Sequence, residues 1–262
     1  AAGASSATTI AREAALNWES WDLYGAPQRA TGVRFAWDSN YEGIEFPPTE
    51  TVVLTVEGPE SATYWRTSTL DLFTDDHWFE NLIWLSHVEE NEIVRMPRDR
   101  LAPARAANPE SWLEQEIEVR ALVDDRLAAA GTPTALDARR LDTVYRLSGG
   151  VLRVNTPLTE GDRYRVWSYA PDPAPAALAR SRPVYPSHAQ EYLEIGSRSF
   201  PAFGARGRSD LTLTILQDPS YRDFSPYRRM YAAARRVAGR AQTPYAAVLA
   251  LESWFRQRGG FS

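Results

Sequence analysis

The first 170 residues contain short apolar runs that read as β-strands. The runs are rich in β-branched and aromatic residues and are separated by Gly, Pro and Asp; they occur at residues 33–37, 51–57, 62–73, 115–123, 142–147, 151–154 and 163–170. Gly149 and Gly150 lie between two of them and predict a hairpin. This pattern predicts an antiparallel β-sandwich or an open barrel. Residues 101–113 fit either a loop or one short helix.

A different pattern begins after residue 170. Residues 171–186 contain five prolines, which indicates a stiff connector. Residues 196–208 read as loop, and residues 211–216 could pair as one more strand. We therefore expect residues 171–224 to form a Pro-rich connector and an irregular segment.

Two amphipathic helices are predicted at the end of the chain. Ser225-Pro226 and Thr243-Pro244 each match a helix start, in which a capping residue precedes proline. The predicted apolar stripes are Tyr227, Met230, Tyr231, Ala234 and Val237 in the first helix, and Tyr245, Val248, Leu251, Trp254 and Phe255 in the second. The predicted fold is thus mainly β with C-terminal α, in three parts: residues 1–170, 171–224 and 225–262.

Composition narrows the chemistry available to the chain. Its 262 residues include no cysteine, which excludes a thiol nucleophile, a disulfide and a zinc–thiolate site within this chain. All 29 basic residues are arginine, so the chain offers no lysine amine. The net charge is −5, divided between −11 on the first 225 residues and +6 on the last 37, and we expect no nucleic-acid partner. No apolar run is long enough for a membrane span, and residues 1–15 do not read as a signal peptide, so we expect a soluble chain.

Several acidic and histidine residues could in principle form a site. Asp75, Asp76 and His77 are better explained as a polar turn before Trp78, because adjacent residues of a strand point to opposite faces. The acidic groups of the chain lack the spacing and the glycine of a calcium loop; they are Glu89, Glu90 and Glu92, and Asp124 and Asp125. His87 and His188 belong to no catalytic motif, and no phosphate-binding glycine motif is present. We therefore assign no catalytic, cofactor-binding or metal-binding residue and expect no cofactor.

The nine tryptophans have two possible roles. They are Trp18, Trp21, Trp37, Trp65, Trp78, Trp84, Trp112, Trp167 and Trp254. Most lie beside apolar residues in predicted strands, which favours a place in the β-core. Exposed aromatic rings could instead stack on sugars.

Several segments, in order, resemble a known family. They are residues 17–25 (NWESWDLYG), 33–46 (VRFAWDSNYEGIEF), 51–56 (TVVLTV) and 64–73 (YWRTSTLDLF), with Trp78. Gly131-Thr132-Pro133, residues 164–169 and residues 241–261 (AQTPYAAVLALESWFRQRGGF) follow in the expected order. The chain resembles the extracytoplasmic region of membrane-anchored bacterial transglutaminase-like proteins of the TgpA type.

The resemblance implies that this chain is the non-catalytic part of a longer protein. In that family a β-rich segment precedes a transglutaminase-like core, and the last stretch of this chain resembles the helix that opens the core. The catalytic Cys, His and Asp lie further downstream, so no residue here inherits a catalytic role. If the core is absent, we expect the last helix to expose Tyr245, Val248, Leu251 and Trp254.

Two functions follow from these observations. The resemblance implies a non-catalytic extracytoplasmic accessory region of a membrane-anchored transglutaminase-like enzyme, which acts by cysteine-dependent acyl transfer or hydrolysis. Its expected partners are the transglutaminase-like core and the membrane helices of the same protein, and a protein or cell-wall substrate. The alternative is a free-standing module that binds cell-wall or other polysaccharide through exposed aromatic rings.

Overall fold

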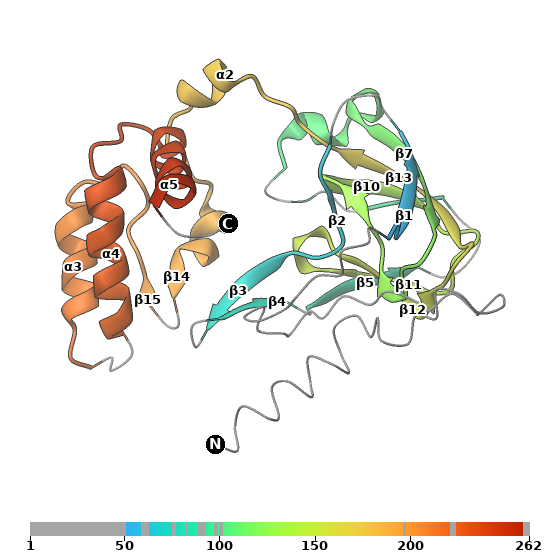
Figure 1. Cartoon of the computed structure of the whole chain (residues 1–262), viewed down its shortest axis with the longest axis horizontal. Helices are drawn as coiled ribbons and strands as arrows, with labels where there is room; N and C mark the ends of the chain where they lie inside the picture. The colour runs from blue at the N-terminus through green and yellow to red at the C-terminus, as the bar shows by residue number, and fades with distance from the viewer. Residues whose placement is uncertain are drawn as a thin grey trace. The chain divides into compact units, whose positions relative to one another are not determined.

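Residues 1–170 and 171–262 form two separate units (Figure 1). The computed structural model describes residues 51–58, 63–74, 77–81, 83–88, 93–96, 99, 102–195, 198–220 and 224–258. The strand predicted at residues 33–37 lies outside the described residues. The division falls between Ala170 and Pro171.

The first unit contains two antiparallel sheets. The five-stranded sheet has the order β1-β7-β13-β10-β6, with bounds Leu54–Glu57, Leu113–Val119, Arg163–Tyr169, Thr132–Asp137 and Ile93–Arg95. The four-stranded sheet has the order β5-β11-β12-β8, with bounds Trp84–Val88, Val144–Leu147, Leu152–Leu158 and Asp124–Arg126. The predicted hairpin at Gly149 and Gly150 is confirmed, since it joins β11 to β12 and both glycines have positive φ, 68° and 72°.

Alternation along β7 shows why these residues form a strand. Gln115, Ile117 and Val119 are buried on one face. On the other face, Glu116 and Glu118 form ion pairs with Arg165 and Arg163 of the neighbouring β13, at 2.9 and 3.0 Å. The period of two therefore separates an apolar face from a charged one.

Both sheets contribute to one apolar core. Ile117, Leu136 and Val166 come from the five-stranded sheet, and Val144 and Leu152 come from the four-stranded sheet. The described strands leave both sheets open at their edges, as in a sandwich rather than a closed barrel. The predicted mainly β fold with C-terminal helices is thus confirmed.

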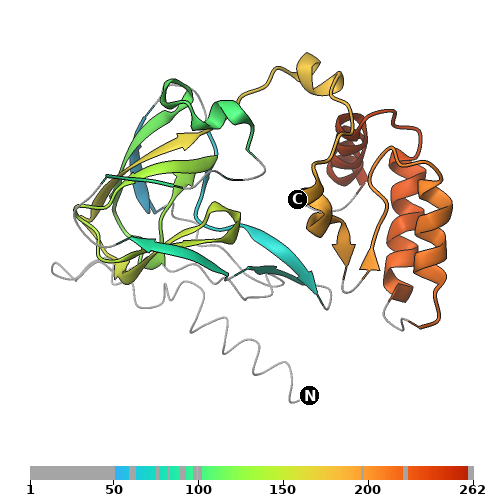
Figure 2. The same ribbon diagram turned by 180° about the vertical axis from the view of Figure 1, so that it is seen from behind.

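Two short strand pairs complete the description of the first unit. β2 (Trp65–Arg66) pairs with β9 (Ala129–Ala130), and β3 (Leu70–Thr74) pairs with β4 (His77–Glu80). The β3–β4 hairpin extends away from the two main sheets in both views (Figures 1 and 2). Residues 101–113, which fitted a loop or a helix, contain two 3-10 turns at Ala104–Ala107 and Pro109–Ser111.

The second unit is mainly helical. Its helices are α2 (Pro175–Ala179), α3 (Arg208–Gln217), α4 (Ser225–Ala238) and α5 (Pro244–Arg258), with a 3-10 turn at Ser187–Leu193 and the hairpin of β14 (Glu194–Ile195) and β15 (Arg198–Ser199). α4 contacts both α3 and α5. No described helix has the length and apolar character needed to cross a membrane.

The strand proposed at residues 211–216 is wrong, because these residues lie within α3. Their sequence alternates Leu and Thr, which suggests a strand, but the buried residues are Thr212 and Leu216. A spacing of four residues places both on one side of a helix. This side of α3 is therefore the buried one, in a unit where α3 also contacts α4.

The predicted start of α5 at Pro244 is confirmed. The predicted cap of α4 is wrong, because Ser225 is already the first helical residue and Phe224 is the N-cap, with no side-chain hydrogen bond.

The apolar stripes of both helices are only partly covered. Met230 in α4 is 62% exposed, and Val248 in α5 is 58% exposed. Tyr245, Leu251 and Trp254 are half-buried. The expected exposure of the last helix is therefore confirmed for Val248 and partial for the other three residues, none of which is fully buried.

Candidate functional site

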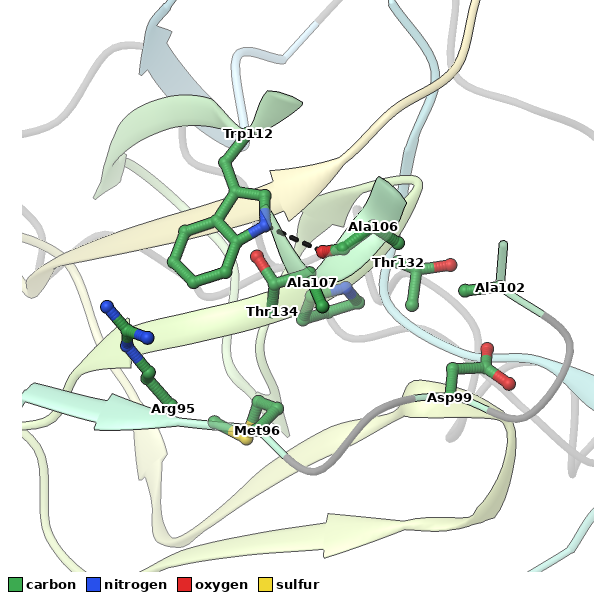
Figure 3. Close-up of a pocket in the computed structure, with 10 residues that line it drawn as sticks. Arg95, Met96, Asp99, Ala102, Ala106, Ala107, Trp112, Thr132 and Thr134 are labelled. Carbon is green, nitrogen blue, oxygen red and sulfur yellow. Dashed lines mark hydrogen bonds between the residues drawn. The ribbon is translucent and has the colours of Figure 1, made fainter. Parts of the chain in front are cut away.

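A half-open cavity of about 260 Å³ lies in the first unit, between the end of β6 and the start of β10 (Figure 3). Its walls are mostly apolar. The described residues that line it are Arg95, Met96, Asp99, Ala102, Ala106, Ala107, Trp112, Thr132, Pro133 and Thr134. The volume is near the lower end of the range for small-molecule sites.

Backbone pairing fixes the wall formed by β6 and β10. The Met96 N–H donates to the Thr134 carbonyl oxygen at 2.8 Å. The Thr134 hydroxyl donates to the Trp167 carbonyl oxygen of β13 at 2.9 Å. The register of β10 against β13 shifts between Pro133 and Ala135. This irregularity in β10 therefore lies at the cavity wall.

Trp112 forms the opposite wall and is held by its own ring nitrogen. Its Nε1–H donates to the Ala106 carbonyl oxygen at 2.7 Å (Figure 3). The Arg95 guanidinium lies over the Trp112 ring, 5.6 Å from the centroid. The indole is thereby fixed at one edge by a hydrogen bond and covered on one face by a cation.

The charges at the two ends of the cavity differ. Arg95 lies at one end and Asp99 at the other (Figure 3). Burial lowers the pKa of Arg66, and the charge of Asp99 opposes this effect. The pKa of Arg146 is lowered for the same reason and opposed by the same carboxylate. Asp99 therefore balances the charge of two partly buried arginines.

The acidic pair at Asp124 and Asp125 belongs to an ion-pair network. Asp124 is buried and lies 3.5 Å from Arg126. Asp125 pairs with Arg126 and Arg153. Burial lowers the pKa of Arg126, but the hydrogen bond and charge of Glu80 and the charges of both aspartates outweigh it, so the net shift is upward. These carboxylates therefore neutralise arginines.

The other sequence candidates do not converge on one point in the described residues. His87 is exposed on β5 and lies opposite Tyr145. His77 begins β4, directly after the expected turn. Asp75, Asp76, Glu89, Glu90 and Glu92 lie outside the described residues. Among those described, no group of three or more histidine or acidic residues could hold a metal ion.

The expectation that tryptophans build the core is wrong for several of them. Trp65 is 38% exposed and Trp78 is 58% exposed. Trp112, Trp167 and Trp254 are half-buried, and Trp18, Trp21 and Trp37 lie outside the described residues. The largest fully buried side chains are instead Ile117, Leu122, Leu136, Leu147 and Leu152. Indoles are rarely buried completely, because the ring is large and its N–H needs an acceptor.

The sequence reasoning missed the cavity. Arg95, Asp99 and Thr134 belong to no motif, and they come together only when β6 and β10 pair. Trp112 was noted only as one of many tryptophans, and no local signal connects it with Arg95.

Two comparisons with known proteins place the chain. A family model described as the TgpA N-terminal domain matches residues 20–175. Two solved structures are similar: the periplasmic domain of TgpA from Pseudomonas aeruginosa, and the same domain bound to ethylmercury. Each is 16% identical with a TM-score of 0.39, and the match covers 80% of this chain.

The match also shows that the solved domains are longer. The chain spans 57% of the first solved domain and 58% of the second. No curated protein matches the sequence. The family model alone covers more than half of the 262 residues. The chain therefore belongs to the TgpA N-terminal domain family.

Proposed function

We propose that this chain is the non-catalytic, extracytoplasmic accessory region of a membrane-anchored transglutaminase-like protein of the TgpA type. The observation that carries the proposal is the family match over residues 20–175. The partners are the transglutaminase-like core and the membrane helices of the same protein. α4 and α5, which lie beyond the matched residues, are the opening helices of that core.

The composition of the chain supports a non-catalytic role. The parent enzyme would use a cysteine to attack an acyl carbon, a histidine to activate the thiol and an aspartate to orient the histidine. This chain contains no cysteine. The nucleophile must then come from another part of the protein, and the substrate is a protein or a cell-wall component.

The reading frame on both sides of the chain gives the first test. We expect membrane spans upstream of Ala1 and a Cys, His and Asp, in that order, downstream of Ser262. We also expect the purified chain to incorporate no fluorescent amine into a glutamine-containing protein. The longer protein should do so, or hydrolyse the carboxamide, and should lose activity when its cysteine becomes serine. A reading frame without such a cysteine contradicts the proposal, as does turnover by the isolated chain.

Exposed aromatic rings favour a second candidate function, polysaccharide binding. Trp78 is 58% exposed and Phe79 is 41% exposed, both on the β3–β4 hairpin. Tyr64, just before β2, is 95% exposed. Soluble cell-wall glycans should then cause a saturable change in tryptophan fluorescence. Loss of this change in Trp78→Ala, with the change kept in Trp254→Phe, would support polysaccharide binding. The accessory role predicts no saturable change.

A further inference from the structure

We propose that the cavity beside Trp112 binds a carboxylate attached to a compact apolar group, with Arg95 as the carboxylate-binding residue. The C-terminal residue of a peptide and a free aryl or alkyl carboxylic acid share this chemistry. The proposal goes beyond the accessory role and does not depend on it.

The first argument is the state of the Arg95 guanidinium. The side chain is exposed, and its one interaction within the described part of the chain is with the Trp112 ring. Other arginines of the same sheet are paired: Arg163 with Glu118, and Arg165 with Glu116. A guanidinium whose N–H donors are accepted by no described residue matches the two oxygens of a carboxylate, and stacking on the indole fixes its orientation.

The second argument is the size and polarity of the walls. The cavity volume is about 260 Å³, and a cavity of about 150 Å³ is large enough for benzene. Trp112 Nε1–H and the Thr134 hydroxyl already donate to carbonyl oxygens, so these walls require no polar ligand atom. A phenyl ring or a branched aliphatic group therefore fits without leaving these two donors unpaired.

The third argument is the direction of the charge. Asp99 lies at the end of the cavity opposite Arg95 (Figure 3), and its carboxylate acts on Arg66 and Arg146. The charge of Asp99 is thus already opposed by two arginines, whereas the exposed guanidinium of Arg95 carries no ion pair with a described residue and attracts a ligand carboxylate. The charge of Arg95 thus sets the orientation of the ligand, with the carboxylate at Arg95 and the apolar group within the cavity.

The test uses the whole chain and a pair of ligands that differ only in charge. N-acetyl-L-phenylalanine is titrated while the NMR signal of the Trp112 indole N–H, assigned with Trp112→Phe, is followed. We expect a saturable shift, with binding about tenfold weaker for the neutral N-acetyl-L-phenylalaninamide. Arg95→Gln should weaken binding of the acid by a similar factor, and Arg120→Gln, in a residue outside the cavity, should not.

A third ligand distinguishes the two sources of the carboxylate. Equal binding of 3-phenylpropionate indicates a free carboxylic acid, and tighter binding of the acetylated amino acid indicates a peptide end. The proposal is overturned if no saturable shift occurs at millimolar ligand, or if the acid and the amide bind equally. The ligand comparison uses the unaltered chain, so it holds even if Arg95→Gln does not fold.

Discussion

At the residue scale, one arginine connects turns that are far apart in the sequence. The Arg66 Nε–H donates to the Gly131 carbonyl oxygen at 2.7 Å, and Nη1 donates to the Gly149 carbonyl oxygen at 3.0 Å. Beside it, Trp65 Nε1–H donates to Gln115 Oε1 at 3.1 Å. Two residues of the segment YWR, which carries the family resemblance, thus have a structural role: the side chains of Trp65 and Arg66 connect the two turns and strand β7.

Gly131 gives a prediction about these turns. Its φ is +53°, and an added Cβ would lie 2.4 Å from the Tyr169 carbonyl oxygen. Gly161 also has positive φ, but nothing lies within 4 Å of an added Cβ. Both alanine substitutions lower the stability because the alanine must adopt a positive φ. Gly131→Ala also brings the new Cβ into the Tyr169 carbonyl oxygen, and this clash should cost about 1–3 kcal/mol more.

Urea unfolding of the two variants measures the difference. We expect Gly131→Ala to lower the free energy of unfolding clearly more than Gly161→Ala. Equal losses would mean that the close approach to Tyr169 is relieved without cost.

Tyr164 gives a prediction about alkaline pH. Its ring is buried, and its hydroxyl donates to the Ala128 carbonyl oxygen at 3.0 Å. Burial raises the pKa of Tyr164 above its ordinary value of 10.0. Above that pH the unfolded chain loses the proton while the folded chain keeps it, so unfolding releases a proton. Stability is then complete below pH 10 and falls above it, by up to about 1.4 kcal/mol per pH unit.

The comparison of Tyr164→Phe with the unaltered chain isolates this effect. Between about pH 8 and pH 11 the variant should lose less unfolding free energy, although it starts about 1 kcal/mol lower because Ala128 loses its donor. Tyr64→Phe, in a residue that is 95% exposed, is the control and should leave the pH profile unchanged. Parallel profiles for Tyr164→Phe and the unaltered chain would contradict the prediction.

At the scale of single elements, the cap of α5 is visible in the sequence, whereas α4 has Phe224 as its N-cap with no side-chain hydrogen bond. The Thr243 hydroxyl accepts the Ala246 N–H at 3.1 Å at the start of α5. Thr243→Ala should lower the stability of the helical unit by about 1 kcal/mol, and Thr243→Ser should keep most of it. Thermal melting followed at the helical circular dichroism band measures this loss. Thr214→Ala, in the middle of α3, should have a smaller effect, and an equal effect would argue against the cap.

The strands show which elements sequence patterns can reveal. The apolar and aromatic runs at residues 115–123 and 163–170 predict strands, and the structure has β7 and β13 there, each with alternate residues buried. β8 consists of the charged residues Asp124, Asp125 and Arg126. Arg126 pairs with Glu80, and Asp125 pairs with Arg153. These partners are distant in the sequence, so a local pattern cannot predict this strand. β10 includes Pro133, which counts against a strand, but the register shift beside it accommodates the proline.

The cavity was missed for a related reason. Its walls are contributed by β6, β10 and two 3-10 turns, and each contributes only one to three residues. A site assembled across strand pairings has no sequence spacing of its own. A sequence motif can be recognised only where its residues are neighbours along the chain.

At the scale of the whole molecule, the first residues of the second unit are exposed and accessible to proteases. Residues 171–177 are exposed, and so are Arg180 and Arg182. Trypsin should cut the folded chain after Arg180, because short exposed segments open most easily. The bond after Arg182 is protected by Pro183, and the absence of lysine leaves arginine as trypsin's target residue.

Mass spectrometry of the early tryptic products tests this expectation. A fragment that begins at Ser181 should appear early in the digest of the unaltered chain and should be absent from the digest of the Arg180→Gln variant. If these residues are protected in solution, no such fragment will appear before the chain is degraded elsewhere.

The position of β13 has a consequence for the synthesis of the protein. β13 is the last strand of the first unit along the chain, yet it lies at the centre of the five-stranded sheet, between β7 and β10. At about 5–20 residues per second, a ribosome needs roughly 6 to 23 s to pass from β1 to the end of β13. During that interval the nascent strands lack their central partner, so the first unit cannot close before its last strand is made. For the extracytoplasmic role proposed above, this delay would keep the chain open while it is exported.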